Sequence, residues 1–112
     1  MVLEVRQVGD IAIVKPCEKY LDANVHEQLR EQLRVQVERT PNIILDLADC
    51  QFMDSSGIGL VLAIYRQAVD SGGQLCITNA NGGLSDVFKL TRLQRLIPIY
   101  KTIEDSLAAL QG

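Results

Sequence analysis

Four consecutive residues could carry chemistry in this chain: Asp54, Ser55, Ser56 and Gly57, directly after the apolar pair Phe52-Met53. Asp and Ser are favoured at helix starts, because their side-chain oxygens accept hydrogen bonds from the unpaired backbone N–H groups there. One such residue is enough for a cap. The N-terminus of a helix also favours an added anion, such as the phosphate of a phosphoserine. Capping alone and a modification site are therefore both open interpretations.

A small serine-dependent enzyme is the catalytic alternative. The nucleophile elbow G-x-S-x-G is not formed around Ser55 or Ser56. A Ser-His-Asp triad would have to use His26, the single histidine, and stays an alternative because triads are defined by geometry. The segment Gly57-Ile58-Gly59 begins a dinucleotide fingerprint, but Leu62 occupies its last glycine position. We expect no catalytic residue and no cofactor, and we expect these glycines to let a helix approach the sheet closely.

Charge and cysteine content exclude further classes. The chain has 11 basic and 14 acidic residues, a net charge of −3, which gives no overall attraction to nucleic acid or to anionic lipid. Its three cysteines are an odd number, widely spaced and without a C-x-x-C pair, so we expect reduced, mostly buried thiols and no metal site. They are Cys17, Cys50 and Cys76.

One segment is basic, with no acidic residue between 86 and 104. A solvated surface is the expected role, and a patch that meets an acidic partner or a phosphate is the alternative. The basic residues are Lys89, Arg92, Arg95 and Lys101.

The length of 112 residues predicts one domain over 1–112, and 47% hydrophobic with 22% charged residues is typical of a soluble globular protein. No apolar run approaches the roughly 18 residues of a membrane span, and residues 1–10 lack the features of a signal peptide. We therefore predict a cytoplasmic protein without membrane contact, monomeric or weakly dimeric.

Hydrophobic periodicity predicts the elements that position these residues. Strands are expected at 2–7, 11–15, 42–47, 74–78 and 97–100, the first two joined as a hairpin at Gly9-Asp10. The first helix is expected to start at Asp22 as N-cap and to end at Thr40-Pro41. Its apolar residues recur every four positions and predict one buried stripe: Val25, Leu29, Leu33 and Val37. Opposite charges three residues apart predict ion pairs on its outer faces, Glu27 with Arg30 and Glu31 with Arg34. Three more helices are predicted at 58–69, 84–90 and 102–110. The second of the four, 58–69, is apolar almost all round and is expected to be the buried one.

The order ββαβαβαβα predicts an α/β fold with a mixed, mainly parallel sheet of about five strands, about four helices and an antiparallel first strand at one edge. Loops that follow the carboxyl ends of parallel strands gather on one side of such a sheet, where binding sites form. We call this side the rim; its loops are 17–22, 48–54 and 79–83. The second of these loops also carries Asp49. The candidate partner-binding residues at the rim are Tyr20, Asp22, Asp54, Ser55, Ser56, Gly57, Asn79 and Asn81.

The segment 52–60, Phe-Met-Asp-Ser-Ser-Gly-Ile-Gly-Leu, resembles the signature of anti-sigma factor antagonists with a STAS domain. The resemblance extends over essentially the whole chain, including the strand at 43–47, Gly72-Gly73 and Phe88. It implies the STAS fold and phosphorylation of the serine after the Asp, which is Ser55, with Ser56 as its less favoured neighbour. Asp22 matches the Asp of the family's first loop, although Val25 replaces a threonine there.

The resemblance also implies a function and partners. The unphosphorylated chain would bind a serine-kinase anti-sigma factor, which brings its own ATP or ADP, and would thereby release the sigma factor for transcription. Phosphorylation would end this binding, and a serine phosphatase would restore it. The alternatives are a STAS module with another partner, such as a stress-signalling scaffold or a transporter accessory subunit, and the small serine enzyme.

Overall fold

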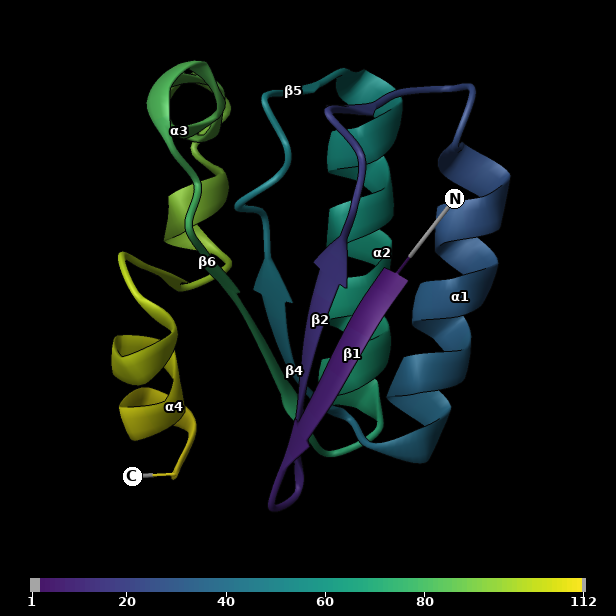
Figure 1. Cartoon of the computed structure of the whole chain (residues 1–112), viewed down its shortest axis with the longest axis vertical. Helices are drawn as coiled ribbons and strands as arrows, with labels where there is room; N and C mark the ends of the chain where they lie inside the picture. Colours follow the sequence, from purple (N-terminus) through teal and green to yellow (C-terminus); the bar gives the residue numbers. More distant parts are fainter. Residues whose placement is uncertain (1–2, 112) are drawn as a thin grey trace.

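A five-stranded sheet of order β1-β2-β4-β6-β7 forms the centre of the computed structural model, which describes residues 3–111 (Figure 1). β1 pairs antiparallel with β2, and the other neighbours are parallel. The predicted fold class and the antiparallel edge strand are therefore confirmed. The strands are β1 (Leu3–Val8), β2 (Ile11–Pro16), β4 (Asn42–Asp46), β6 (Gln74–Thr78) and β7 (Ile99–Tyr100).

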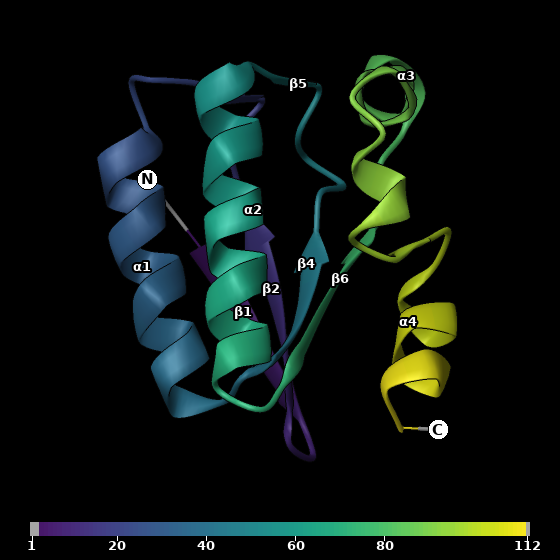
Figure 2. The same cartoon turned by 180° about the vertical axis from the view of Figure 1, so that it is seen from behind.

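Four α-helices cover the two faces of this sheet unequally (Figures 1 and 2). α1 and α2 lie side by side on one face, and α4 lies on the other. Alternate residues of β2 show the division, because Ala12 and Val14 join the large core under α1 and α2, whereas Ile11 and Ile13 join a small core under α4. The helices are α1 (His26–Arg39), α2 (Ser55–Asp70), α3 (Gly82–Leu90) and α4 (Ile103–Gln111), with a 3₁₀ turn η1 (Leu93–Arg95).

The helix α2 is less buried than its composition predicted. It begins at Ser55, and its core face is formed by Leu60, Val61, Ile64 and Ala68. Among residues 3–111, α2 has more buried residues than any other helix, which confirms it as the buried helix, but Leu62 is only half-buried and Ala63 is exposed. The reason is that α2 covers one face of the sheet and leaves its opposite side to solvent.

The helix α1 begins later than predicted. The carboxylate of Asp22 accepts a hydrogen bond from the N–H of Asn24 at 3.0 Å, which closes a turn ahead of the helix. The N-cap position falls on Val25, without a side-chain cap, so the prediction of Asp22 as N-cap was wrong. The predicted buried stripe is confirmed for Leu29, Leu33 and Val37.

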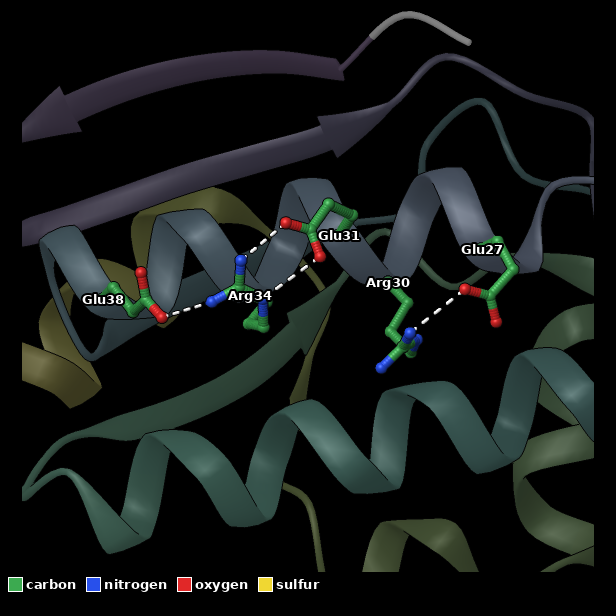
Figure 3. Close-up of polar contacts among 5 residues, drawn as sticks. All are labelled: Glu27, Arg30, Glu31, Arg34 and Glu38. Carbon is green, nitrogen blue, oxygen red and sulfur yellow. Dashed lines mark hydrogen bonds and ion pairs between the residues drawn. The ribbon is translucent and has the colours of Figure 1, made fainter.

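The outer face of α1 carries ion pairs at the predicted spacing of three residues (Figure 3). Arg30 lies 3.1 Å from Glu27, and Arg34 pairs with Glu31 and also with Glu38, four residues on. These exposed pairs give modest support to the helix.

A second, two-stranded sheet was not predicted. β3 (Tyr20–Leu21) and β5 (Phe52–Met53) pair in parallel inside two of the predicted rim loops. Two residues are too short a stretch for hydrophobic periodicity to detect. The last strand is also shorter than predicted, beginning at Ile99 after η1, and of the predicted strand 2–7 the residue Val2 lies outside the described residues.

Candidate functional site

The paired strands β3 and β5, which we call the ribbon, have one buried side and one side that faces solvent at the rim. Tyr20 is paired with Phe52, and Leu21 with Met53. Leu21 and Met53 are each 1% exposed and join the core, whereas Tyr20 is 53% and Phe52 47% exposed. Because successive side chains of a strand point to opposite faces, the two aromatic rings form an outward pair. Tyr20 was a predicted site residue. Phe52 was missed, although its position beside Met53 repeats that of Tyr20 beside Leu21.

The ribbon is fixed to the first turn of α2 by a close approach at Gly57. A Cβ atom there would overlap the carbonyl oxygen of Leu21 and the side chain of Met53. The predicted need for glycine is confirmed at this position, although the surface approached is the ribbon and not the main sheet. At Gly59 the prediction was wrong, because a Cβ atom there would meet nothing within 4 Å. The aromatic pair is thus held at a fixed place relative to the start of α2.

Asp54 is the N-cap of α2. Its Oδ1 accepts hydrogen bonds from the backbone N–H of Gly57 at 3.0 Å and from the hydroxyl of Ser56 at 2.6 Å. The Ser56 hydroxyl, followed by the Gly57 amide, lowers the pKa of Asp54, with smaller contributions from the backbone amides of Ser56 and Ala23. The carboxylate is therefore ionised at neutral pH. The backbone N–H of Asp54 donates to the carbonyl of Leu21 at 3.3 Å, which joins the second rim loop to the first.

Ser55 differs from both of its neighbours. It is the first residue of α2 and is exposed. Within residues 3–111 its hydroxyl has no hydrogen-bond partner, whereas Ser56 is bound to Asp54. The two serines that the sequence could not tell apart thus have different surroundings. One supports the cap, and the other presents its hydroxyl to solvent at a helix N-terminus.

The rim is acidic around these residues. The loops 17–22 and 48–54 contain four carboxylates and one lysine, a local charge of −3 that equals the net charge of the whole chain. A shallow hollow of about 380 Å³ lies between the two loops. A partner that binds here meets negative charge around an aromatic pair. The charged residues are Glu18, Lys19, Asp22, Asp49 and Asp54.

The third rim loop is held in place through Asn79. Asn79 adopts a left-handed conformation, with φ of 60°, and its side-chain amide donates a hydrogen bond to Asp46 at 2.9 Å. Asp46 is 6% exposed and also accepts the N–H of Ala48 at 3.0 Å, so Asn79 ties the end of β6 to the end of β4. A separate hollow of about 380 Å³ lies beyond, lined by Asn79, Asn81, Ser85, Tyr100 and Lys101 among others.

The remaining candidates are His26, the three cysteines and the basic segment between 86 and 104. Nδ1 of His26 lies 3.6 Å from Glu27 at the start of α1. Cys50 and Cys76 are buried free thiols, and Cys17 is half-buried, which confirms the prediction of reduced, mostly buried cysteines. Burial raises the pKa of Cys76 to about 11. The four basic residues between 86 and 104 are all exposed, as expected for a solvated surface.

Residues 3–111 contain no group of three or more His, Cys, Asp or Glu side chains placed so that it could hold a metal ion. No helix in the same range has the length and apolar character that crossing a bilayer requires.

These features describe an α/β domain with a polar site at the carboxyl ends of its parallel strands. The sequence model of the STAS domain matches residues 2–106, so the chain belongs to the STAS domain family. Among its relatives, the anti-sigma F factor antagonist of Paenibacillus polymyxa is 29% identical over 93 residues, which cover 81% of this chain and 80% of that protein.

Solved structures share the fold. An anti-sigma factor antagonist from Mycobacterium paratuberculosis superposes with a TM-score of 0.89 at 20% identity, covering 99% of this chain and 94% of the other. The phosphorylated form of the Bacillus cell fate determinant SpoIIAA superposes with a TM-score of 0.71 at 23% identity, covering 96% and 98%. At these identities the likeness establishes the fold.

Proposed function

We propose that this chain is an anti-sigma factor antagonist that acts as a binding module without catalytic activity of its own. In its unphosphorylated form the rim binds a serine-kinase anti-sigma factor, and the sigma factor is released. The ATP or ADP belongs to the kinase, and a serine phosphatase reverses the modification. Membership of the STAS family and the names of similar proteins support this proposal.

The observation that carries the proposal is the division of roles at the start of α2. Asp54 caps the helix, Ser56 donates its hydroxyl to that cap, and Ser55 keeps an exposed hydroxyl with no partner among the described residues. Phosphorylation at Ser55 therefore breaks no hydrogen bond of the fold. Phosphorylation at Ser56 would remove a donor from the Asp54 carboxylate and place a second anion against it.

The switch is electrostatic. A phosphate adds a charge of about −2 at neutral pH to a rim that already carries −3. The free chain tolerates it, because solvent screens the repulsion and the N-terminus of α2 favours an anion. In the complex the same charge would be buried against a surface that fits a neutral hydroxyl, where an unpaired anion is costly.

The proposed contact surface centres on the aromatic pair. Tyr20 and Phe52 offer rigid apolar area next to Ser55, and aromatic side chains are typical anchors of protein interfaces. Asp22 and Asp54 surround them with negative charge. Asn79 and Asn81 belong to the outer margin of this surface, Asn79 mainly by fixing the shape of its loop.

Phosphopeptide mapping and affinity capture test the proposal. After incubation of the chain with ATP and a lysate of its own bacterium, we expect a single phosphate, located on Ser55. Captured protein should be identified by mass spectrometry as a serine-kinase anti-sigma factor, and its affinity measured by calorimetry. We expect Ser55→Ala to bind and to resist phosphorylation. Ser55→Glu should bind at least about 100-fold more weakly, with a Tm close to that of the wild type.

Ser56→Ala is the matched control, because it alters the neighbouring hydroxyl and leaves Ser55 in place. It should still be phosphorylated and should still bind. Phosphate on Ser56, or tight binding by Ser55→Glu, would contradict the switch. Capture of a stress-signalling scaffold or a transporter instead would favour the alternative hypothesis of a STAS module with another partner. Ester hydrolysis that disappears in Ser55→Ala would favour the enzyme.

A further inference from the structure

The outer edge of β1 is an open strand edge. β1 pairs with β2 on one side and is the terminal strand of the sheet, and Figure 1 shows it in front of the other strands. Its register with β2 runs unbroken from Leu3 to Val8, without a bulge, and it contains no proline or glycine. The four residues from Glu4 to Gln7 are exposed. This edge offers a row of backbone donors and acceptors that no strand of the described residues uses.

The sequence of this edge is complementary to itself in one orientation. If two copies of β1 pair antiparallel around Val5, Glu4 of each copy lies opposite Arg6 of the other. Opposite charges in such directly facing positions stabilise a strand pair, and like charges destabilise it. A parallel pairing in register would place Glu4 against Glu4 and Arg6 against Arg6. The charge pattern therefore selects the antiparallel, two-fold arrangement.

The helix side of the edge adds apolar area without net charge. A groove of about 230 Å³ runs between β1 and α1. Its apolar part is formed by the half-buried Leu3 and Val35 and by Val5, which is 43% exposed. Its two charged lining residues, Glu31 and Arg39, have opposite signs, so the lining carries no net charge. A second copy placed around Val5 would bring its own Val5 to this groove.

The opposite side of the edge is also balanced. A hollow of about 620 Å³ lies beside α4, with Ile13 and Ile103 as apolar lining. Two acidic and two basic residues surround it: Glu4, Asp46, Arg6 and Lys15. Glu4 is already 3.1 Å from Lys15 on β2. Two copies of the rim would repel one another, because each carries a charge of −3. Two copies of the β1 edge would not, because its acidic and basic residues are equal in number.

We propose that the β1 edge is an interaction surface for a second copy of this chain, which joins two five-stranded sheets into one across a two-fold axis. Because the strands run in opposite directions across the junction, the two rims point away from each other. Both copies of Ser55 then stay accessible. The association is thus independent of the partner switch, and either proposal can fail without the other.

Sedimentation velocity on the purified full chain, from about 5 μM to 1 mM, tests this surface. We expect a reversible equilibrium between 12.4 kDa monomers and dimers, without larger species. Arg6→Glu places two glutamates opposite each other on each side of the axis and should raise the dimer Kd about tenfold or more. Arg66→Glu is the matched control, because Arg66 is an exposed arginine of α2, away from β1. It changes the net charge equally and should leave the Kd unchanged.

A compensating variant separates charge pairing from damage to the strand. The triple exchange Glu4→Arg, Arg6→Glu and Lys15→Glu restores opposite charges across the junction and keeps an ion pair between β1 and β2. It should return the Kd to within about threefold of the wild type, with thermal melts confirming that each variant folds. A wild type that stays monomeric at 1 mM overturns the proposal. So do equal effects of Arg6→Glu and Arg66→Glu, or a triple variant that remains monomeric.

Discussion

Two segments with the same chemical pattern lie side by side at the rim, and they precede different helix starts. Tyr20-Leu21-Asp22 and Phe52-Met53-Asp54 each consist of an aromatic residue, an aliphatic residue and an aspartate. They pair in parallel, residue against residue. In both, the aromatic side chain faces outward and the aliphatic one is buried. Up to this point the two segments are equivalent.

The residues that follow each aspartate make the difference. After Asp54 come Ser-Ser-Gly, the helix begins at once, and the carboxylate caps it through the N–H of Gly57. After Asp22 come Ala-Asn-Val, and the carboxylate instead closes a turn through the N–H of Asn24. Only the second segment therefore places a serine on the first turn of a helix, beside an ionised cap. The comparison indicates that the aspartate alone does not define the site.

The largest expected effect concerns what the segments share. Leu21→Ala and Met53→Ala should each lower the free energy of unfolding by about 2–5 kcal/mol, because both side chains are fully buried and leave cavities. Urea denaturation measures the loss. Tyr20→Ala and Phe52→Ala are the matched outward controls and should cost less than about 1 kcal/mol while weakening partner binding. Similar losses for the inward and outward positions would contradict the equivalence of the two segments.

A second prediction concerns the close approach that only α2 makes. Gly57→Ala should destabilise by about 1–3 kcal/mol, because its Cβ would overlap a backbone carbonyl that cannot move without shifting the ribbon. Gly59→Ala is the control two residues on, where nothing lies within 4 Å. It should stabilise by up to about 1 kcal/mol, since alanine favours the helix. Chemical denaturation of both variants should therefore give shifts of opposite sign.

The sequence predicted the features that repeat over many residues. The five strands of the main sheet, the antiparallel edge strand and the buried stripe of α1 follow from periodicity and from the alternation of elements. Features that depend on a few residues or on tertiary packing were not predicted. The ribbon has two residues per strand, and the burial of α2 depends on which side of the sheet it covers, which its apolar composition does not reveal.

The candidate site was predicted as a set of residue types but not as an arrangement. Asp54, Ser55 and Ser56 were indicated together, and the sequence left open which would cap the helix. That choice depends on the direction of the Asp54 carboxylate, which accepts the Ser56 hydroxyl and the Gly57 amide at once. Likewise, the role of Asn79 depends on Asp46, which lies 33 positions earlier and becomes its neighbour only in the folded sheet.

A third, smaller effect should separate the two aspartates. Asp54→Ala should lower the Tm by several degrees, because it removes the acceptor for both the Gly57 amide and the Ser56 hydroxyl at a helix start. Asp22→Ala removes the acceptor for one amide in a turn and should lower the Tm less. Calorimetric melts at pH 7 give both values. If Asp22→Ala lowers the Tm more than Asp54→Ala does, the turn before α1 contributes more to stability than the N-cap of α2.

The smallest expected effect is the pH dependence of the cap. The Ser56 hydroxyl and the Gly57 amide lower the pKa of Asp54 in the folded chain below its ordinary value. A carboxylate whose pKa is lowered by folding contributes stability that is fully present above the unfolded pKa, about 4, and is lost as the pH falls through the folded pKa. The Tm difference between the wild type and Asp54→Asn should therefore be constant from about pH 5 to 7 and should shrink as the pH is lowered below about 4.

Ser56→Ala removes the largest cause of the pKa shift, so its own melting profile should depend less on pH in the acid range than that of the wild type. Melts at half-unit steps from about pH 2.5 to 7 compare the three proteins. A difference between the wild type and Asp54→Asn that persists unchanged at the acid end would mean that the Asp54 charge does not stabilise the start of α2, and the two aspartates of the rim would then differ in position alone.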